Sequence, residues 1–205
     1  MDSAEVEAAL LALLQATSKA SRRLHSISVA YTAETLCRRF GLDPVVGRIG
    51  GLGHDIVKDR PIGEQWDLAG RVGLHPATSP LTDLVHSLRG TEFADKVIHG
   101  PAAAVFLRES ALAESGDILR AVAYHSTARM GMGPLEKLLF AADKLEPGRK
   151  GIGAEDARAL LELGIEDLFH YALGRSIAWL GLKGGSIAQS TVDLYNSLGS
   201  AGRGT

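Results

Sequence analysis

The sequence is poor in several features that mark particular classes of protein. It has one cysteine in 205 residues, so a disulfide within the chain is impossible. Aromatic residues make up 5% of the chain and the formal net charge is −2, so the composition indicates no broad surface for nucleic acid or an anionic membrane. No apolar run approaches the length of a membrane-spanning helix. We therefore expect no nucleic-acid partner and no membrane partner.

The same shortages bear on location and size. The lone Cys37 fits a reducing compartment, and the acidic residues 1–7 lack the basic region of a signal peptide. We expect a cytoplasmic protein. A chain of 205 residues with 45% hydrophobic content is long enough for one domain with a substantial core.

The spacing of the apolar residues predicts an all-α protein. No stretch of useful length alternates apolar and polar residues as a half-buried strand does. The dipeptide Asp43-Pro44 suits a helix start, and Pro134 suits another. The predicted helices cover residues 2–17, 21–40, 43–55, 99–112, 116–125, 134–146, 154–163, 165–182 and 186–198.

These helices are expected to form a single domain over residues 1–198, with its motif core at about 21–149 and C-terminal helices at 154–198. Residues 199–205 are expected to be a disordered tail. Residues 59–91, broken by prolines and glycines, are expected to be an irregular connection that could form one wall of a pocket. Whether this segment moves as a lid is left open.

Histidines and aspartates recur on or near the inner faces of five of the predicted helices. Buried charges are costly without partners, and transition metals bind imidazole and carboxylate groups. Any single histidine is more often a core or surface residue, so the prediction depends on the set as a whole. The other histidines, His75, His86 and His170, match no such pattern and are predicted not to be ligands. The candidate metal ligands are His25, His54, Asp55, His99, His125 and Asp143.

The order of these six residues resembles that of the HD-domain metal-dependent phosphohydrolases. Residues 53–61, 124–132 and 135–149 resemble the YqeK-type subfamily of symmetrical bis(5'-nucleosyl)-tetraphosphatases, and the likeness covers about residues 5–182. Its most specific piece is Ala142-Asp-x-x-Glu-Pro-Gly-Arg149. The resemblance implies one HD-type helical hydrolase domain that splits diadenosine tetraphosphate into two ADP by means of a metal-activated hydroxide.

The resemblance also implies a site with two divalent transition-metal ions. One ion would be held by His25, His54, Asp55 and Asp143, and the other by Asp55, His99 and His125, so that Asp55 bridges. Iron is the favoured metal, and the ligand types also allow manganese. Catalytic roles are expected for Asp55, Lys58 and Arg129. Basic residues expected to bind the substrate phosphates are Lys58, Arg60, Arg129 and Arg149, unless these are ordinary surface charges.

Two departures leave the substrate open. Lys144 stands where the subfamily usually has tyrosine, and Ala128 where it usually has glycine, so another nucleotide is one alternative. A non-catalytic regulatory module and a di-iron oxygenase are further alternatives. Glu136 is expected either to orient a ligand or, with more weight, to pair with Lys137 or another neighbour. The oligomeric state is left open, with a homodimer as one alternative.

Overall fold

The structure is a computed structural model, and it describes residues 1–183 and 189–201. Within these residues it contains helices and no strand, which confirms the predicted all-α class. The elements are α1 (Ser3–Thr17), α2 (Ala20–Arg39), α3 (Pro44–Gly53), α4 (Ile62–Ala69), η1 (Val72–Leu74), η2 (Ser79–Leu81), α5 (Thr82–Leu88), α6 (Ala94–Val97), α7 (His99–Glu109), α8 (Gly116–Tyr124), α9 (Pro134–Leu145), α10 (Ala154–Glu162), α11 (Ile165–Leu182) and α12 (Gln189–Ala201).

The starts of the two helices that matter most for the site follow from local chemistry. The Asp43 side chain accepts a hydrogen bond from the backbone N–H of Val45 at 2.9 Å, and Pro44 occupies the first position of α3. The start of α9 is held by Glu136, whose carboxylate accepts from the backbone N–H of Gly133 at 2.7 Å. Both starts lie where proline predicted them.

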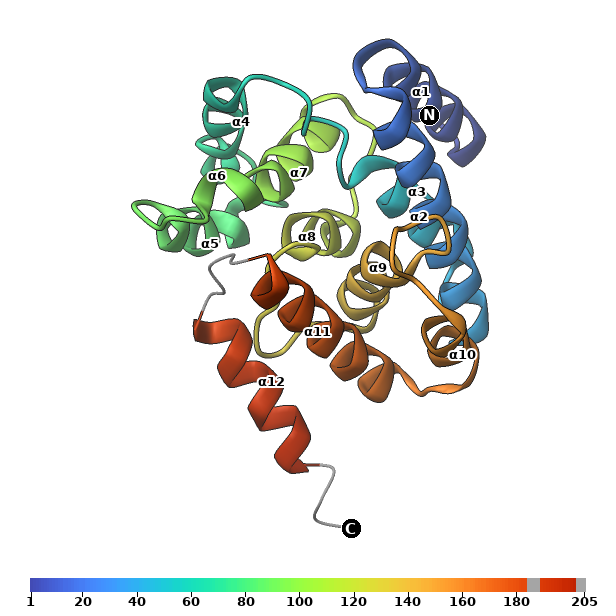
Figure 1. The fold of residues 1–205 in the computed structure, drawn as a ribbon. Helices are drawn as coiled ribbons and strands as arrows, with labels where there is room; N and C mark the ends of the chain where they lie inside the picture. Colours follow the sequence, from blue (N-terminus) through green and yellow to red (C-terminus); the bar gives the residue numbers. More distant parts are fainter. Residues whose placement is uncertain (184–188, 202–205) are drawn as a thin grey trace.

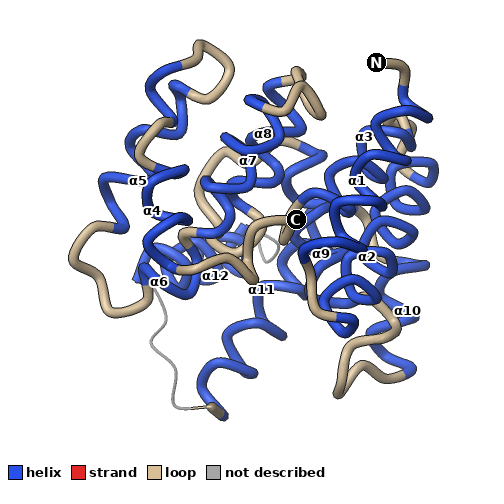
Figure 2. Tube along the Cα trace, turned by 90° about the horizontal axis from the view of Figure 1, so that it is seen from above, coloured by secondary structure: helices blue, strands red, loops and turns tan. Residues whose placement is uncertain are grey.

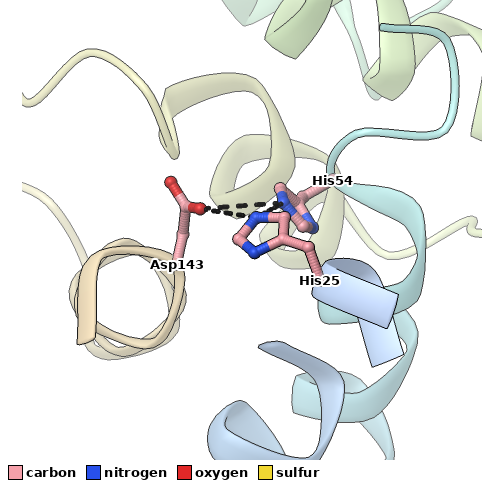
Figure 3. A group of neighbouring side chains, drawn as sticks. All are labelled: His25, His54 and Asp143. Atoms are coloured by element: carbon pink, nitrogen blue, oxygen red, sulfur yellow. Dashed lines mark hydrogen bonds and ion pairs between the residues drawn. The ribbon is translucent and has the colours of Figure 1, made fainter. Parts of the chain in front are cut away.

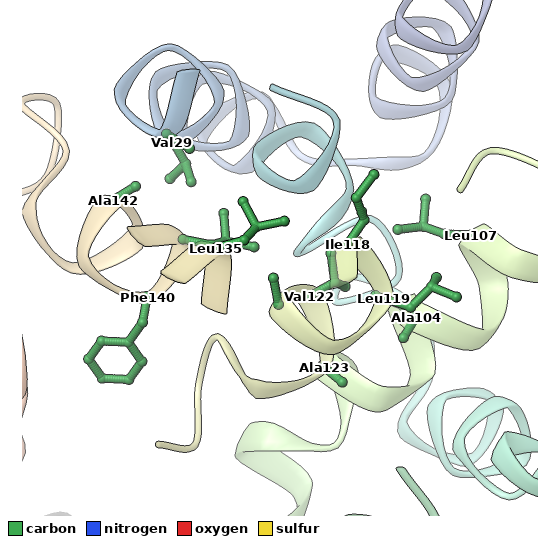
Figure 4. Close-up of a cluster of buried hydrophobic side chains, with 14 of the residues drawn as sticks. Val29, Ala104, Leu107, Ile118, Leu119, Val122, Ala123, Leu135, Phe140 and Ala142 are labelled. Atoms are coloured by element: carbon green, nitrogen blue, oxygen red, sulfur yellow. The ribbon is translucent and has the colours of Figure 1, made fainter. Parts of the chain in front are cut away.

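Helices α8 and α9 lie at the middle of the molecule (Figure 1). Helices α1 to α3 and α10 gather on one side, while α4 to α6 lie on the other, and the view from above agrees (Figure 2). Side chains from α2, α7, α8 and α9 form one buried apolar cluster, part of which Figure 4 shows. The Phe140 ring of α9 meets the Phe169 ring of α11 edge-on, with centroids 5.5 Å apart.

The glycines of α3 allow it to press against α2. A Cβ on Gly51 would lie 2.4 Å from the Cα of Ala30, and one on Gly47 would lie 2.7 Å from the carbonyl oxygen of Ala33. These distances are too short for real atoms, so only glycine permits the approach. Close packing of α3 against α2 therefore accounts for Gly47 and Gly51.

The structure refines several predicted boundaries. Segment 59–91 contains α4 and α5 as well as two short 3-10 helices, and α6 is an additional turn that the pattern did not predict. Helix α12 runs to Ala201, so residues 199–201, predicted as part of a disordered tail, are helical. Residues 186–188 and 202–205 lie outside the described part. No helix among the described residues is long and apolar enough to cross a membrane.

Candidate metal centre

The structure brings the six candidate ligands together where five helices meet. His25 comes from α2 and His54 is the residue that ends α3, followed by Asp55. On the other side, His99 is the first residue of α7 and His125 is the residue that ends α8, while Asp143 lies in the last turn of α9. All are buried except His25, whose side chain is 20% exposed.

The two carboxylate oxygens of Asp55 face different histidines. Its Oδ1 lies 3.2 Å from Nε2 of His99 and 3.4 Å from Nε2 of His125. Its Oδ2 lies 3.7 Å from Nε2 of His54. One carboxylate therefore touches both halves of the group, which is the arrangement that a bridging ligand needs.

The other half of the group consists of Asp143 and the two imidazoles of His25 and His54 that face it (Figure 3). Oδ1 of Asp143 lies 3.0 Å from Nε2 of His25 and 3.9 Å from Nε2 of His54. Donor atoms of His25, His54 and Asp143 all lie within 4.8 Å of one another, and so do those of His54, Asp55 and His125. His54 thus belongs to both sets, and the donor atoms within each set are close enough to bind one ion.

Hydrogen bonds fix which nitrogen each imidazole points at the centre. Nδ1 of His54 donates to the carbonyl oxygen of Gly51 at 2.7 Å, and Nδ1 of His125 donates to that of Val122 at 2.6 Å. Because a carbonyl can only accept, each Nδ1 carries the proton and a neutral ring keeps a lone pair on Nε2. Such a second partner on the far nitrogen is typical of histidines that bind metals.

Nδ1 of His25 is held differently, by a carboxylate that sequence reasoning did not identify. It lies 3.1 Å from Oε1 of Glu146, while Oε2 of Glu146 accepts from Oγ of Ser28 and from the backbone N–H of Gly148, both at 2.6 Å. Glu146 is buried. In the sequence, the only signal for Glu146 is its position before a proline in the matched motif. Its contact with His25 is visible only in the folded protein, because His25 belongs to α2.

The protonation states of His54, His99 and Asp55 fit metal ligation, whereas the His25 ring has to release a proton when it binds a metal ion. Burial lowers the pKa of His54 to about 3 and that of His99 to about 4, so both rings are neutral near pH 7. Burial also lowers the pKa of His25, but hydrogen bonds to Asp143 and Glu146 outweigh it and raise the value to about 9. Burial would raise the pKa of the Asp55 carboxyl, but His54 and Lys58 hold it well below its usual range.

The donor geometry tests whether metal ions fit this group. Nε2 of His99 lies 3.0 Å from Nε2 of His125, and Nε2 of His25 lies 3.3 Å from that of His54. Facing imidazole lone pairs repel unless a proton or cation lies between them. The buried Oδ1 of Asp55 also accepts no well-aligned hydrogen bond from the described residues. Metal–ligand bonds of about 2.0–2.2 Å place neighbouring donors roughly 3 Å apart, so the set fits divalent ions.

A cavity of about 360 Å³ opens onto this centre and combines the acidic ligands with basic side chains. Lys58 Nζ lies 3.3 Å from Asp55, and Arg149 Nη1 lies 3.0 Å from Asp143. Its lining includes the ligands His25, Asp55 and Asp143 and the basic residues Arg22, Lys58, Lys144, Arg149 and Lys150.

Three of these basic residues were not among the predicted phosphate-binding residues. Arg22 Nη1 lies 2.5 Å from Oδ2 of Asp55, and Lys144 Nζ lies 2.5 Å from Oδ2 of Asp143. Lys144 had been noted only as a departure from the subfamily, and Lys150 follows the matched motif. Arg22 lies three residues before His25, so helical spacing places it on the same side of α2.

Two predicted phosphate-binding residues lie outside this cavity's lining. Arg60 stacks on the Phe106 ring, with its Cζ 4.7 Å from the centroid. Arg129 stacks on Tyr124 at 4.6 Å and pairs with the buried carboxylate of Glu136 at 2.9 Å. The neighbour that Glu136 pairs with is therefore Arg129.

The three remaining histidines lie away from the group. His75 contacts Arg108, with its Nε2 2.9 Å from the Nε of that arginine. The ring of His170 lies against that of Tyr195, with centroids 4.4 Å apart. His86 lies in the last turn of α5. None belongs to either set of donors found among the described residues.

An all-α fold that converges histidines and aspartates on one buried centre defines a class of helical metal-binding proteins. Residues 22–148 match the model of the family described as the HD domain. Because this match spans more than half of the chain, the protein belongs to the HD domain family, and the predicted family is confirmed.

Named relatives agree with this assignment. The chain is 29% identical over 177 residues to the symmetrical bis(5'-nucleosyl)-tetraphosphatase of Bacillus subtilis, covering 86% of this chain and 89% of that protein. It is equally similar to the protein of the same name from Halalkalibacterium halodurans, of which it covers 88%. A crystal structure from Clostridium acetobutylicum, titled as a predicted HD superfamily hydrolase involved in NAD metabolism, matches with a TM-score of 0.77 and 25% identity over 94% of this chain and 96% of that one.

Proposed function

We propose that the protein hydrolyses diadenosine tetraphosphate symmetrically, so that one dinucleotide and one water yield two ADP. The water oxygen forms a bond to one of the two inner phosphorus atoms, and the bond from that phosphorus to the central bridging oxygen breaks. The observation that carries the proposal is the cavity in which Asp55 and Asp143 lie among five basic side chains. The names of the relatives in two species support this substrate.

We further propose that two divalent ions occupy the centre, iron being favoured and manganese the alternative. His25, His54, Asp55 and Asp143 would hold one, and Asp55, His99 and His125 the other. Such ions, when bound, lower the pKa of a shared water and neutralise charge on phosphoryl oxygens. The cytoplasmic location suggested by the single cysteine belongs to the same proposal.

The basic side chains supply positive charge for the phosphate groups that do not contact the metal ions. In this structure Asp55 pairs with Arg22 and Lys58. Asp143 pairs with Lys144 and Arg149. A carboxylate that binds a divalent ion is already neutralised, so the same cations become available to phosphate oxygens in the cavity. Positioning and charge neutralisation are the main requirements of phosphoryl transfer.

Arg60 and Arg129 can contact the substrate only if their side chains move or if the substrate extends beyond the smaller cavity. Each is engaged with a carboxylate and an aromatic ring. We propose that Arg129 contacts the phosphate chain only where that chain leaves the metal centre, because its partner Glu136 restrains it. Lys58, which lies in the cavity next to Asp55, is the better candidate for a role at the reacting phosphorus.

Product analysis tests the proposed reaction. Purified protein loaded with ferrous iron is incubated anaerobically with diadenosine tetraphosphate, and the nucleotides are separated by chromatography. Two ADP for each dinucleotide consumed is the expected result. ATP with AMP, or no turnover by the iron- and manganese-loaded protein, would refute it. Asp55→Asn serves as the inactive control.

A second candidate is hydrolysis of another nucleotide, which Lys144 favours because its partly buried ammonium adds a charge next to Asp143. Assays with nucleoside mono-, di- and triphosphates compare their kcat/KM with that of the dinucleotide. A preferred mononucleotide would establish this alternative. Binding of metal and nucleotide without any turnover would instead indicate a regulatory module, and oxygen consumption would indicate an oxygenase.

A further inference from the structure

A second, larger cavity of about 710 Å³ is lined in part by the chain that follows His125. Leu84 and Ser87 of α5 form one part of its wall, and Leu194 of α12 forms another. The rest comes from Tyr124 and from residues 127–130, which link α8 to α9. Its volume falls within the ~300–1,000 Å³ typical of small-molecule sites. The wall that segment 59–91 contributes agrees with the expectation for that segment.

The two cavities share one segment of chain. Ser126 lines the smaller cavity, where its Oγ lies 3.2 Å from Nε2 of His99. The next residue, Thr127, lines the larger one. Consecutive Cα atoms are about 3.8 Å apart, so one short piece of chain contributes to the walls of both cavities.

The lining of the larger cavity suits a flat heteroaromatic group. Leucines and the rings of Phe93 and Tyr124 supply apolar contact surface. Ser87, Thr127 and Arg129 add side chains with hydrogen-bonding groups to the same lining. A hydrocarbon chain would leave such groups unpaired, whereas a nucleobase combines apolar faces with hydrogen-bonding edges.

We propose that the larger cavity binds the purine base of a nucleotide whose phosphates lie in the smaller cavity. This inference rests on the proposed function for the choice of a purine and locates that substrate's base. Arg129 then stands in the wall of the base cavity, which explains why it stacks on Tyr124 and does not pair with Asp55 or Asp143. Ala128, buried in the same wall, sets the depth available to the base.

The test compares ADP with inorganic pyrophosphate, which carries the diphosphate group without a nucleoside. Affinities of the manganese-loaded full chain for both are measured by titration calorimetry. The variants are Ala128→Phe and Ser87→Trp, which fill the cavity from different walls, and Leu161→Trp on the exposed surface of α10 as the matched control. Circular dichroism confirms that each variant is folded.

We expect wild type and Leu161→Trp to bind ADP at least tenfold more tightly than pyrophosphate. Either filled variant that folds should reduce this ratio to below threefold with little change for pyrophosphate. Equal wild-type affinities, or an unchanged ratio in a folded filled variant, would overturn the inference. If neither variant folds, protection of residues 127–130 from hydrogen exchange by ADP but not pyrophosphate replaces them, and its absence overturns the inference. Failure of the proposed reaction would appear separately, as missing dinucleotide turnover.

Discussion

Replacing Glu146 by glutamine should weaken metal binding although Glu146 is not a proposed ligand. The buried carboxylate uses both oxygens: one contacts Nδ1 of His25 and the other accepts from Ser28 and Gly148. Glutamine has the same shape but only one oxygen. In either orientation its NH₂ group faces a donor, namely the backbone N–H of Gly148 or the protonated Nδ1 of His25.

The size of the effect follows from what is lost. If the amide turns its NH₂ toward His25, the proton moves to Nε2 and the ring cannot ligate. If it turns the other way, a neutral oxygen replaces a charged one and the N–H of Gly148 loses its acceptor. Hydrogen bonds to charged groups contribute about 1.5–3 kcal/mol, and partners of ligating histidines contribute about 10–100-fold in metal affinity. We expect a loss near the upper end of that range, because both orientations are penalised.

Competition with a chelator measures the metal affinity of wild type, Glu146→Gln and Ser28→Ala. Ser28→Ala removes one donor to Glu146 but leaves the carboxylate facing His25, so its loss should stay within about fivefold, which corresponds to the ~1 kcal/mol of a typical hydrogen bond. A folded Glu146→Gln variant whose affinity changes by less than threefold would show that Glu146 does not orient a ligand.

Three other changes test the remaining parts of the account. Asp55→Ala should lose both metal ions, and His125→Ala one, in metal analysis of the purified variants; full metal content in Asp55→Ala would exclude bridging. Gly51→Ala should lower the free energy of unfolding by about 1–3 kcal/mol in urea titrations, because its Cβ would overlap Ala30, whereas Gly63→Ala, with open space around it, should not destabilise the protein. Chelation should lower the thermal midpoint, and added Mn²⁺ should restore it, since a ligand at 100 times its Kd adds about 2.7 kcal/mol; an unchanged midpoint would argue against metal binding.

The fold was accessible from the sequence because its helix boundaries have local causes. Pro44 and Pro134 mark starts that the structure reproduces, with Asp43 capping α3 as its position suggested. The C-terminal end was less accessible, because nothing in residues 199–201 distinguishes a last helical turn from a tail. The role of the α3 glycines also needed three dimensions, since Gly51 and Ala30 belong to different helices.

The candidate site also has residues that the sequence could predict and residues that it could not. The six donors could be proposed from their order because each lies at a recognisable helix position. The partners of these donors could not, since Glu146 and Arg22 meet His25 and Asp55 only across the fold. Arg129 shows the converse: its motif suggested phosphate binding, but the pairing with Glu136 depends on how the loop after α8 returns to α9.

The measurement that tests the central claim most directly is a crystal structure of the iron-loaded protein with anomalous scattering recorded at the iron edge. The account predicts two peaks about 3.5–4 Å apart, the spacing of two-metal sites, with Asp55 touching both. One peak should contact His99 and His125, and the other His25 and Asp143. A single peak, or two peaks that Asp55 does not bridge, would contradict the account.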